Sequence, residues 1–332
     1  MRPAVLNIIL GLLMLALFVA SMAVGPAELD ISESVRGLFA GGGEAAGIIM
    51  REIRLPRALL GLGIGFTLGI SGAVLQGFLR NPLAEPGIIG VSAMAAFGAV
   101  LIFYSGLAGS TLYALPAGAL LGAVVAVLLL LALAARSGST LTLILAGVAL
   151  SSLSAALTSL VLNLSPNPFA SYEIIFWLLG SLKDRSMEHV WLALPLMAAG
   201  WLLIALSGRA IDALSLGEEA AASLGIHMKR TRLLIVMGTA LGVGAATAVA
   251  GTIGFVGLVV PHLIRPLTNR LPSRLLLPAG LGGAVLLLAA DVAVRLVLPT
   301  GELNVGVLTA LIGAPFFLWL VVRSRREVFY AA

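Results

Sequence analysis

Charged side chains are scarce in this sequence, and those beside long apolar runs are the first candidates for a functional role. Arg51, Arg54 and Arg57 are spaced three apart just before such a run, so a helical backbone would place them on one face. Cations at this position either reach lipid headgroups or pair with acidic groups. Two interpretations stay open: anchoring to headgroups, and a basic patch that binds carboxylates of a partner protein.

A second charged pair lies near the end of another apolar run. Asp291 and Arg295 are spaced i, i+4, which is the spacing of an ion pair within one helix. Asp291 could at the same time orient Arg295 toward the outside of the membrane, the side where Arg51, Arg54 and Arg57 are expected. This pattern predicts electrostatic contact rather than covalent chemistry.

The longest hydrophilic stretch, residues 208–232, predicts an element that docks on another protein. It contains the segment GEEAAASLG at residues 217–225, in which Glu and Ala favour a helix and Gly225 can end it in the left-handed conformation. Lys229, Arg230 and Arg232 follow directly. A helix that lies on the membrane surface is the alternative interpretation.

The sequence lacks motifs for catalysis, for nucleotide binding and for metal binding. There is no GxxxxGK[ST] loop, and neither lysine, Lys183 or Lys229, follows a glycine-rich phosphate loop. The three histidines are scattered and cysteine is absent. We therefore expect no enzyme activity and no cofactor bound by this chain. If ATP drives its function, another polypeptide must bind the ATP and Mg²⁺.

The elements that position these residues must be membrane-spanning helices. The 332 residues are 60% hydrophobic and only 11% charged, whereas a soluble domain has about 25% charged residues. The mean hydropathy is +1.11. The net charge of +5 is small and scattered, which argues against a nucleic-acid partner. We predict an all-α polytopic membrane protein with residues 1–332 as one transmembrane domain.

Apolar runs of the length that crosses a bilayer recur ten times. They lie near residues 4–24, 57–78, 88–106, 113–135, 142–163, 190–207, 233–250, 253–268, 275–297 and 304–322. The runs 88–106 and 253–268 are short or rich in Gly and Pro. The first run could instead be a cleaved signal peptide, but its removal would leave nine spans with termini on opposite sides.

The distribution of positive charge predicts the orientation. Of 20 Lys and Arg residues, seven fall in loops assigned outside and the other 13 in loops assigned inside. The seven are Arg36, Arg51, Arg54, Arg57, Lys183, Arg185 and Arg295. The positive-inside rule then places both termini in the cytoplasm.

Small and polar residues inside the spans predict how the helices pack. Gly61, Gly65 and Gly69 begin a ladder of small residues four apart, and Gly238 and Gly242 begin another, so neighbouring backbones should approach closely. The segment 80–87 has two prolines and a glycine, which predicts irregular backbone at membrane depth. The fifth span carries hydroxyls that either bond to neighbouring helices or line a pore, namely Ser151, Ser152, Ser154, Thr158 and Ser159.

Six motifs in order resemble the permease family that imports iron–siderophore complexes, haem and vitamin B12, the FecCD or BtuC-like permeases. They are RLPR (54–57), GISGAVLQ (69–76), NPLAEPG (81–87), LAGVAL (145–150), GFVGLVVPH (254–262) and GAP (313–315). The resemblance covers residues 51–323. It implies the type II fold of ATP-binding-cassette importers, with about ten transmembrane helices per subunit, in the bacterial inner membrane.

The resemblance also implies partners: a homodimer, two ATPase subunits, and a periplasmic or lipid-anchored substrate-binding protein. Arg54, Arg57 and Arg295 match positions that meet glutamates of the binding protein. The segment 216–225 matches the coupling helix that contacts the ATPase, with Leu216, Gly217, Glu218, Glu219, Ala220, Ala221 and Gly225 as the contact positions. Ser139, Thr140 and Leu141 match a cytoplasmic gate, although the family often has a small polar residue where this chain has Leu141.

The expected function is therefore transport of an iron(III) chelate, siderophore or haem, across the inner membrane by alternating access. Cobalamin is the alternative cargo within the same family. Two other classes of membrane protein are alternatives. An inverted-repeat secondary transporter would carry an ionisable residue near mid-membrane, and an intramembrane enzyme would need a catalytic constellation; neither feature is evident in the sequence.

Overall fold

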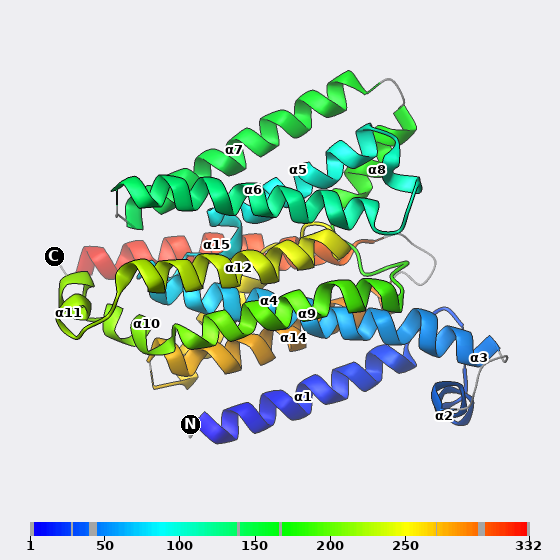
Figure 1. Ribbon diagram of the computed structural model, residues 1–332. Helices are drawn as coiled ribbons and strands as arrows, with labels where there is room; N and C mark the ends of the chain where they lie inside the picture. Colours follow the sequence, from blue (N-terminus) through cyan, green and yellow to red (C-terminus); the bar gives the residue numbers. More distant parts are fainter. Residues whose placement is uncertain are drawn as a thin grey trace.

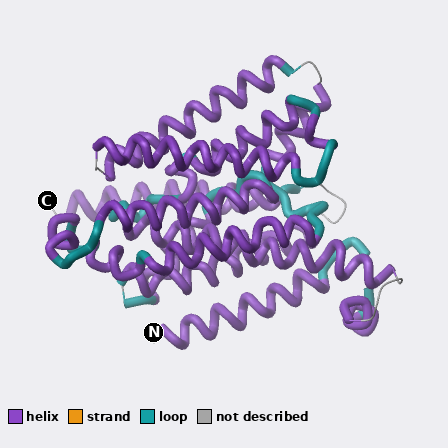
Figure 2. The backbone as a smooth tube through the Cα atoms, in the orientation of Figure 1, coloured by secondary structure: helices purple, strands orange, loops and turns teal. Residues whose placement is uncertain are grey.

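The computed structural model describes residues 3–27, 29–39, 45–137, 140–165, 168–269, 271–297 and 303–330, and every regular element in these ranges is a helix (Figure 2). Ten helices form the body of the molecule: α1 (Pro3–Ala23), α4 (Leu55–Phe78), α5 (Val91–Tyr104), α6 (Ala114–Ser137), α7 (Thr140–Leu164), α9 (Met187–Leu206), α12 (Met228–Ala250), α13 (Val256–Ile264), α14 (Pro272–Val297) and α15 (Val305–Tyr330).

Shorter elements connect them. These are α2 (Ile31–Phe39), α3 (Ala45–Ile48), the π-helical turn η1 (Ile49–Arg54), the 3₁₀ turns η2 (Pro86–Ile89), η3 (Leu107–Gly109) and η4 (Arg265–Leu267), and the helices α8 (Pro168–Leu178), α10 (Gly208–Leu214) and α11 (Glu218–Ser223).

Each of the ten predicted spans coincides with one of the ten body helices, so the predicted fold class is confirmed. Within the described residues, seven helices are long and apolar enough to cross a membrane. Three apolar helical segments are shorter: Val91–Tyr104, Val256–Leu267 (α13 with η4) and Val305–Leu320 (part of α15). The first two match the runs expected to be short. They are short because irregular segments, 79–85 and 251–255, replace part of each crossing.

The body helices run roughly lengthwise between two ends of the molecule (Figure 1). One end carries α2 and α3 and is called the α2 end; the other carries α10 and α11 and is called the α11 end. The centre is α4, which packs against α14, α9, α12 and α13. Helix α1 packs along α14 and α4 and otherwise exposes apolar side chains such as Ile8 and Leu12. The apolar flanks between the two ends fit a lipid environment.

The two predicted glycine ladders are confirmed as close helix contacts. A Cβ at Gly69 would collide with the Ala279 carbonyl of α14, and one at Gly283 with the Gly65 carbonyl. The second ladder brings Gly238 and Gly242 of α12 against Gly200 of α9 in the same way. Because lipid provides no hydrophobic driving force between helices, such close backbone approach supplies the packing energy.

Candidate functional site

Arg54 is buried at the α2 end, where it binds the chain that leaves α1. Only 3% of the Arg54 surface is exposed. Nη1 donates to the carbonyls of Met22 and Ala23 at 2.9 and 3.0 Å, and Nη2 to that of Ala27 at 2.6 Å. Three carbonyls therefore surround one guanidinium. The Arg54 side chain is therefore bound within the protein and does not anchor the chain to lipid headgroups.

Arg57 and Arg295 share one buried carboxylate. Arg57 Nε donates to both oxygens of Asp291 at 3.0 and 3.2 Å, and its Nη2 to Oδ1 at 2.8 Å. Arg295 Nη2 donates to Oδ2 at 2.7 Å, which confirms the predicted i, i+4 pair. The side chains of Arg57, Arg295 and Asp291 are 19%, 8% and 1% exposed.

Arg295 also binds the end of α1. Its Nη1 donates to the carbonyls of Ser21 and Val24 at 2.9 and 2.6 Å, and its Nη2 to Ser21 Oγ at 2.6 Å. Arg54, Arg57, Asp291 and Arg295, called here the arginine network, thus join α1, α4 and α14. The three arginines expected to dock a partner are brought together but are engaged within the chain, and partner docking stays a prediction.

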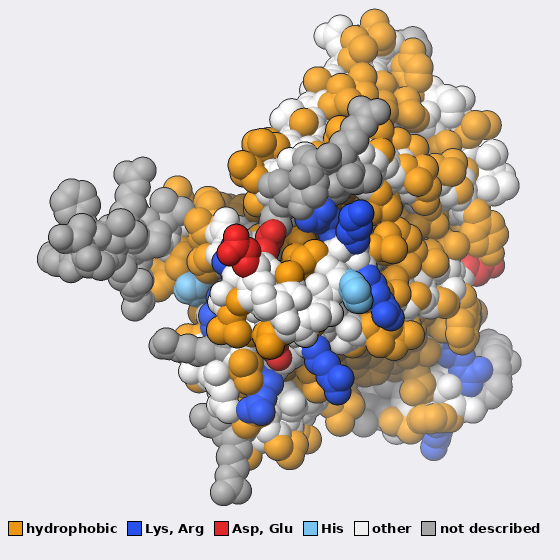
Figure 3. Space-filling model, turned by 60° about the vertical axis from the view of Figure 1, so that its left-hand side comes forward, with side chains coloured by type: hydrophobic (Ala, Val, Ile, Leu, Met, Phe, Trp, Pro, Cys, Tyr) orange, Lys and Arg blue, Asp and Glu red, His pale blue; other side chains and the backbone are white. Residues whose placement is uncertain are grey.

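At the opposite end, the segment expected to contact an ATPase forms a short helix on the surface. Helix α11 starts after Gly217, at φ 110°, and ends before Gly225, at φ 82°, so the predicted left-handed end at Gly225 is confirmed. Ala221 is fully buried, whereas Leu216 and Leu224 are 69% and 65% exposed. Figure 3 shows acidic, basic and histidine side chains around this end.

A connection that the sequence analysis missed ties this end to α14. Asp212 of α10 accepts bonds from the backbone N–H and the hydroxyl of Ser273, at 2.8 and 2.5 Å. Ser273 stands in the first turn of α14, where free N–H groups favour an acceptor with negative charge. The sequence signal was present, since Pro272-Ser273 opens an apolar run, but nothing local indicated Asp212 as its partner.

The predicted gate residues are described only in part. Ser139 lies outside the described residues. Thr140 begins α7, and Leu141 is 63% exposed on its first turn. The gate role therefore stays a prediction.

Helix α7 exposes a polar stripe. Ser152, Ser159 and Asn163 are exposed at spacings of seven and four, which places them on one face of the helix. Leu160 is exposed on the neighbouring face, whereas the exposed Leu145, seven residues before Ser152, lies in line with the stripe and marks its end. The predicted cluster of hydroxyl residues therefore contains both buried and exposed members. Ser154 is buried and bonds to the Leu150 carbonyl, while Ser152 and Ser159 are exposed.

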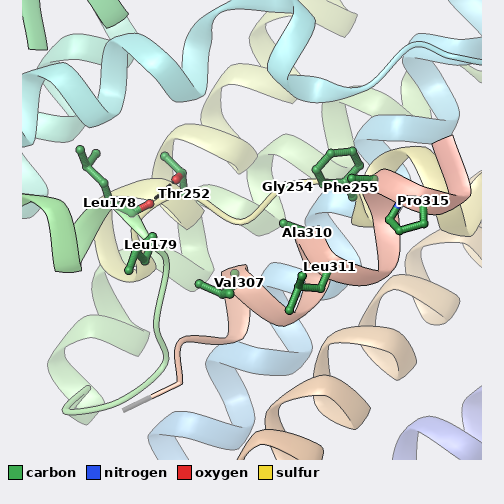
Figure 4. Close-up of a pocket in the computed structure, with 11 residues that line it drawn as sticks. Leu178, Leu179, Thr252, Gly254, Phe255, Val307, Ala310, Leu311 and Pro315 are labelled. Atoms are coloured by element: carbon green, nitrogen blue, oxygen red, sulfur yellow. Dashed lines mark hydrogen bonds between the residues drawn. The ribbon is translucent and has the colours of Figure 1, made fainter. Parts of the chain in front are cut away.

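An open hollow of about 560 Å³ lies along α15, next to the end of α8 and the irregular segment 251–255 (Figure 4). Its lining contains no charged residue: Leu178, Leu179, Thr252, Gly254, Phe255, Gly306, Val307, Ala310, Leu311, Ala314 and Pro315. The Thr252 hydroxyl bonds to the Leu178 carbonyl, and Gly306 N–H to the Gly180 carbonyl at 3.1 Å, which hold the three elements together.

A smaller hollow of about 370 Å³ opens near the α2 end, between the ends of α5 and α8 and the loop that precedes α9. Aromatic rings of Phe103, Tyr172 and Trp177 line it together with charged loop residues such as Arg185. Burial lowers the pKa of the Arg185 guanidinium, and the adjacent Asp184 partly offsets this.

Within the described residues, no group of three or more His, Asp or Glu side chains is placed to hold a metal ion. The arrangement consists of two charged ends, a polar stripe on one span and an apolar hollow beside another. It can hold and pass a solute, and it offers surfaces for partner proteins.

Comparisons with known proteins agree on one family. The sequence model of the FecCD transport family matches residues 12–323. The vitamin B12 import system permease protein BtuC of Citrobacter koseri is 38% identical over 318 residues, 96% of this chain and 94% of that protein. BtuC of Salmonella paratyphi A is 42% identical over 279 residues, 83% and 84% of the two chains.

Two further proteins are similar over most of the chain. The uncharacterized ABC transporter permease protein YvrB of Bacillus subtilis is 40% identical over 283 residues, 84% of this chain and 80% of that protein. A solved structure described as an inward-facing conformation of a putative metal-chelate type ABC transporter has a TM-score of 0.85 and 34% identity, covering 97% of this chain and 100% of that one.

Proposed function

The chain belongs to the FecCD transport family as an ABC importer permease of the inner membrane, and we propose that two copies of it enclose a transport pathway for cobalamin. An iron(III) chelate was the sequence-based expectation. Cobalamin, or vitamin B12, is favoured here because two relatives named vitamin B12 import system permease protein are 38% and 42% identical to this chain over most of its length. The iron chelate is kept as the alternative that the uptake experiment below distinguishes.

The observation that carries the pathway is the polar stripe on α7. A hydroxyl or amide that faces hydrocarbon without a partner costs free energy, so an exposed row of such groups on a span indicates contact with water or with another polar surface. A second copy placed against α7 and α15 would cover Leu160 on the neighbouring face and leave Ser152, Ser159 and Asn163 on a shared channel. The uncharged hollow beside α15 would widen that channel for a bulky cargo.

The two ends fit the two partners of an ABC importer. We assign the α11 end, with both chain termini, to the cytoplasm, where the exposed Leu216, Glu219 and Leu224 contact the ATPase. We assign the α2 end to the outside, where the arginine network receives the binding protein. Docking there would exploit an excess of positive charge. Among the described residues, Arg57 and Arg295 share the Asp291 carboxylate, and Arg54 bonds to backbone carbonyls.

The pathway is tested by thiol labelling, because the natural chain has no cysteine and needs no background removed. Ser152→Cys and Ser159→Cys are compared with Leu160→Cys as the matched control on the apolar face. Maleimides react with the thiolate, which forms readily only in water, so the serine positions should label about tenfold or more faster in the assembled transporter. Preferential labelling of Leu160→Cys would show that the stripe does not face the channel.

A further inference from the structure

Helix α2 lies crosswise at one end of the bundle. Figure 1 shows it nearly along its own axis, next to the end of α1, whereas the body helices run across the picture. Its Leu38 packs on the buried cluster of Met22, Met50 and Ala58, which joins the last turn of α1 to η1 and α4. Since the body helices cross the membrane, α2 runs along the membrane surface.

The length of α1 shows the depth at which α2 lies. Helix α1 has 21 residues, about 31 Å at 1.5 Å per residue, which matches a hydrocarbon core of about 30 Å. Its end at Ala23 therefore marks the boundary between acyl chains and headgroups. Because Met22 of α1 and Leu38 of α2 belong to one packed group, α2 lies at or just beyond this boundary.

Contacts at both ends hold the nine residues of α2 in a helix. The Asp30 N–H donates to the Glu33 carboxylate at 3.3 Å, and the Ser32 hydroxyl donates to Asp30 Oδ2 at 3.0 Å, so the first turn is capped. Arg51 Nε donates to the Leu38 carbonyl at 2.9 Å, where a cation also complements the helix dipole. The helix is therefore formed by contacts within the permease itself.

The surface of α2 has three faces of different character. Gly37 faces the protein, where a Cβ would collide with the backbone of α3. A second face exposes Val35 and Phe39, which are four residues apart and 54% and 79% exposed. The third face exposes Glu33 and Arg36. At 3.6 residues per turn, the apolar and the charged faces are about 110° apart around the helix axis.

The surroundings of the apolar face indicate what covers it. The adjoining α1 exposes Leu12, Leu15 and Val19, and such side chains on a spanning helix face lipid. The neighbouring α3 and η1 expose Ile48 and Ile53. Helix α7, against which a second copy is proposed to lie, stands on the opposite side of the bundle from α1 (Figure 1). The apolar face of α2 thus continues a lipid-facing flank at the depth of the headgroups.

We infer that α2 is an interfacial helix: Val35 and Phe39 insert among the lipids at the α2 end, while Glu33 and Arg36 face water. A helix with one apolar and one charged side, lying in the membrane plane at this depth, binds the boundary between headgroups and acyl chains. In the orientation proposed above, this is the outer leaflet. The inference goes beyond the proposed function and does not depend on the transported solute.

The lipid contact is joined to the arginine network by the same stretch of chain. Arg54 binds the carbonyls of Met22, Ala23 and Ala27 just before α2, and Arg51 binds the last turn of α2. An α2 held in the interface therefore fixes the height of the network above the acyl chains, and with it the height of the surface proposed to receive the binding protein.

The test uses nitroxide labels, because the natural chain has no cysteine and each variant then carries one. Val35→Cys probes the apolar face, and Glu33→Cys is the matched control on the charged face of the same helix. The permease with its ATPase subunits is placed in nanodiscs of phosphatidylethanolamine and phosphatidylglycerol. Electron paramagnetic resonance then measures collisions of each label with oxygen, which dissolves in acyl chains, and with a water-soluble nickel chelate.

The ratio of oxygen to nickel collisions should be at least about tenfold higher at Val35→Cys than at Glu33→Cys, equivalent to about 1.4 kcal/mol in the partitioning of the two reagents. The ratio should stay the same when the binding protein is added. This result would support insertion of the apolar face into lipid.

Three results would overturn the inference. The first is an equal ratio at the two positions. The second is a Val35→Cys label that meets the nickel chelate in nanodiscs and is shielded only by added binding protein, which would assign the apolar face to that partner. The third is spectral broadening between two Val35→Cys labels, which would assign it to a second copy. A failure of the proposed cargo would leave all these measurements unchanged, so the two proposals are tested separately.

Discussion

Asp291→Asn should strongly destabilise the protein, because Asp291 is the one carboxylate in the arginine network. It is 1% exposed and accepts bonds from Arg57 at 2.8, 3.0 and 3.2 Å and from Arg295 at 2.7 Å. Asn has nearly the same shape but no charge. The substitution therefore leaves two buried guanidinium groups without their counter-ion.

The magnitude follows from the burial of the pair. Removing one partner of a buried ion pair costs about 3–5 kcal/mol, because the remaining charge is left without compensation. At about 1.4 kcal/mol for each factor of ten, this corresponds to at least a hundredfold rise in the unfolding equilibrium constant. The backbone carbonyls that Arg295 also contacts limit the loss, so the lower part of this range is expected.

The assay is unfolding in mixed micelles at rising SDS, followed by fluorescence of the four tryptophans. Glu33→Gln on the exposed surface of α2 is the matched control and should change stability by about 0.5 kcal/mol or less. The double variant Asp291→Asn with Arg57→Gln should recover about 1–3 kcal/mol, since it removes one of the uncompensated cations. A single variant as stable as the control would refute the idea that this network holds α1 to α4 and α14.

Other predictions concern the two ends. The isolated permease should show no saturable ATP turnover, which a phosphate-release assay on the pure chain would check. Glu219→Arg should abolish coupling while leaving insertion intact, measured as co-purification with the ATPase and stimulated hydrolysis in liposomes. Asp212→Ala should remove the two hydrogen bonds to Ser273 and weaken the contact between α10 and α14 by about 1–3 kcal/mol. The expected result is fewer cargo molecules transported per ATP hydrolysed, and an unchanged ratio would contradict this prediction. Charge reversal at Arg54, Arg57 or Arg295 should weaken the affinity for the binding protein about 5–150-fold and make that affinity less dependent on salt. Titration of the binding protein onto the transporter in nanodiscs measures both, and wild-type affinity would place the docking surface elsewhere.

The spans could be predicted because their signal is local. A run of about 20 apolar residues is visible without knowledge of the fold, and the ladders of small residues show which faces pack closely. The left-handed end at Gly225 was predictable for the same reason, since a glycine after a short Glu/Ala run has few other roles.

The polar connections could not be predicted, because their partners are far apart in the chain. Arg57 and Asp291 are 234 residues apart, and Asp212 and Ser273 are 61 residues apart. The pair of Asp291 with Arg295 was predicted only because its spacing is that of one helix turn. The segment 80–87 was predicted to be irregular, yet its contacts with other helices, such as Pro86 against Gly257 of α13, depend on where that segment lies in the bundle.

The most direct test of the proposed function is uptake into proteoliposomes that contain the permease with its ATPase subunits and binding protein. With ATP inside and radiolabelled cobalamin outside, we expect accumulation that stops when ATP is withheld and persists when ion gradients are collapsed. A ferric siderophore offered under the same conditions should accumulate at least about tenfold more slowly, the factor that 1.4 kcal/mol of discrimination provides. ATP-dependent uptake of the siderophore but not of cobalamin would contradict the proposed cargo, and uptake driven by an ion gradient without ATP would contradict the mechanism itself.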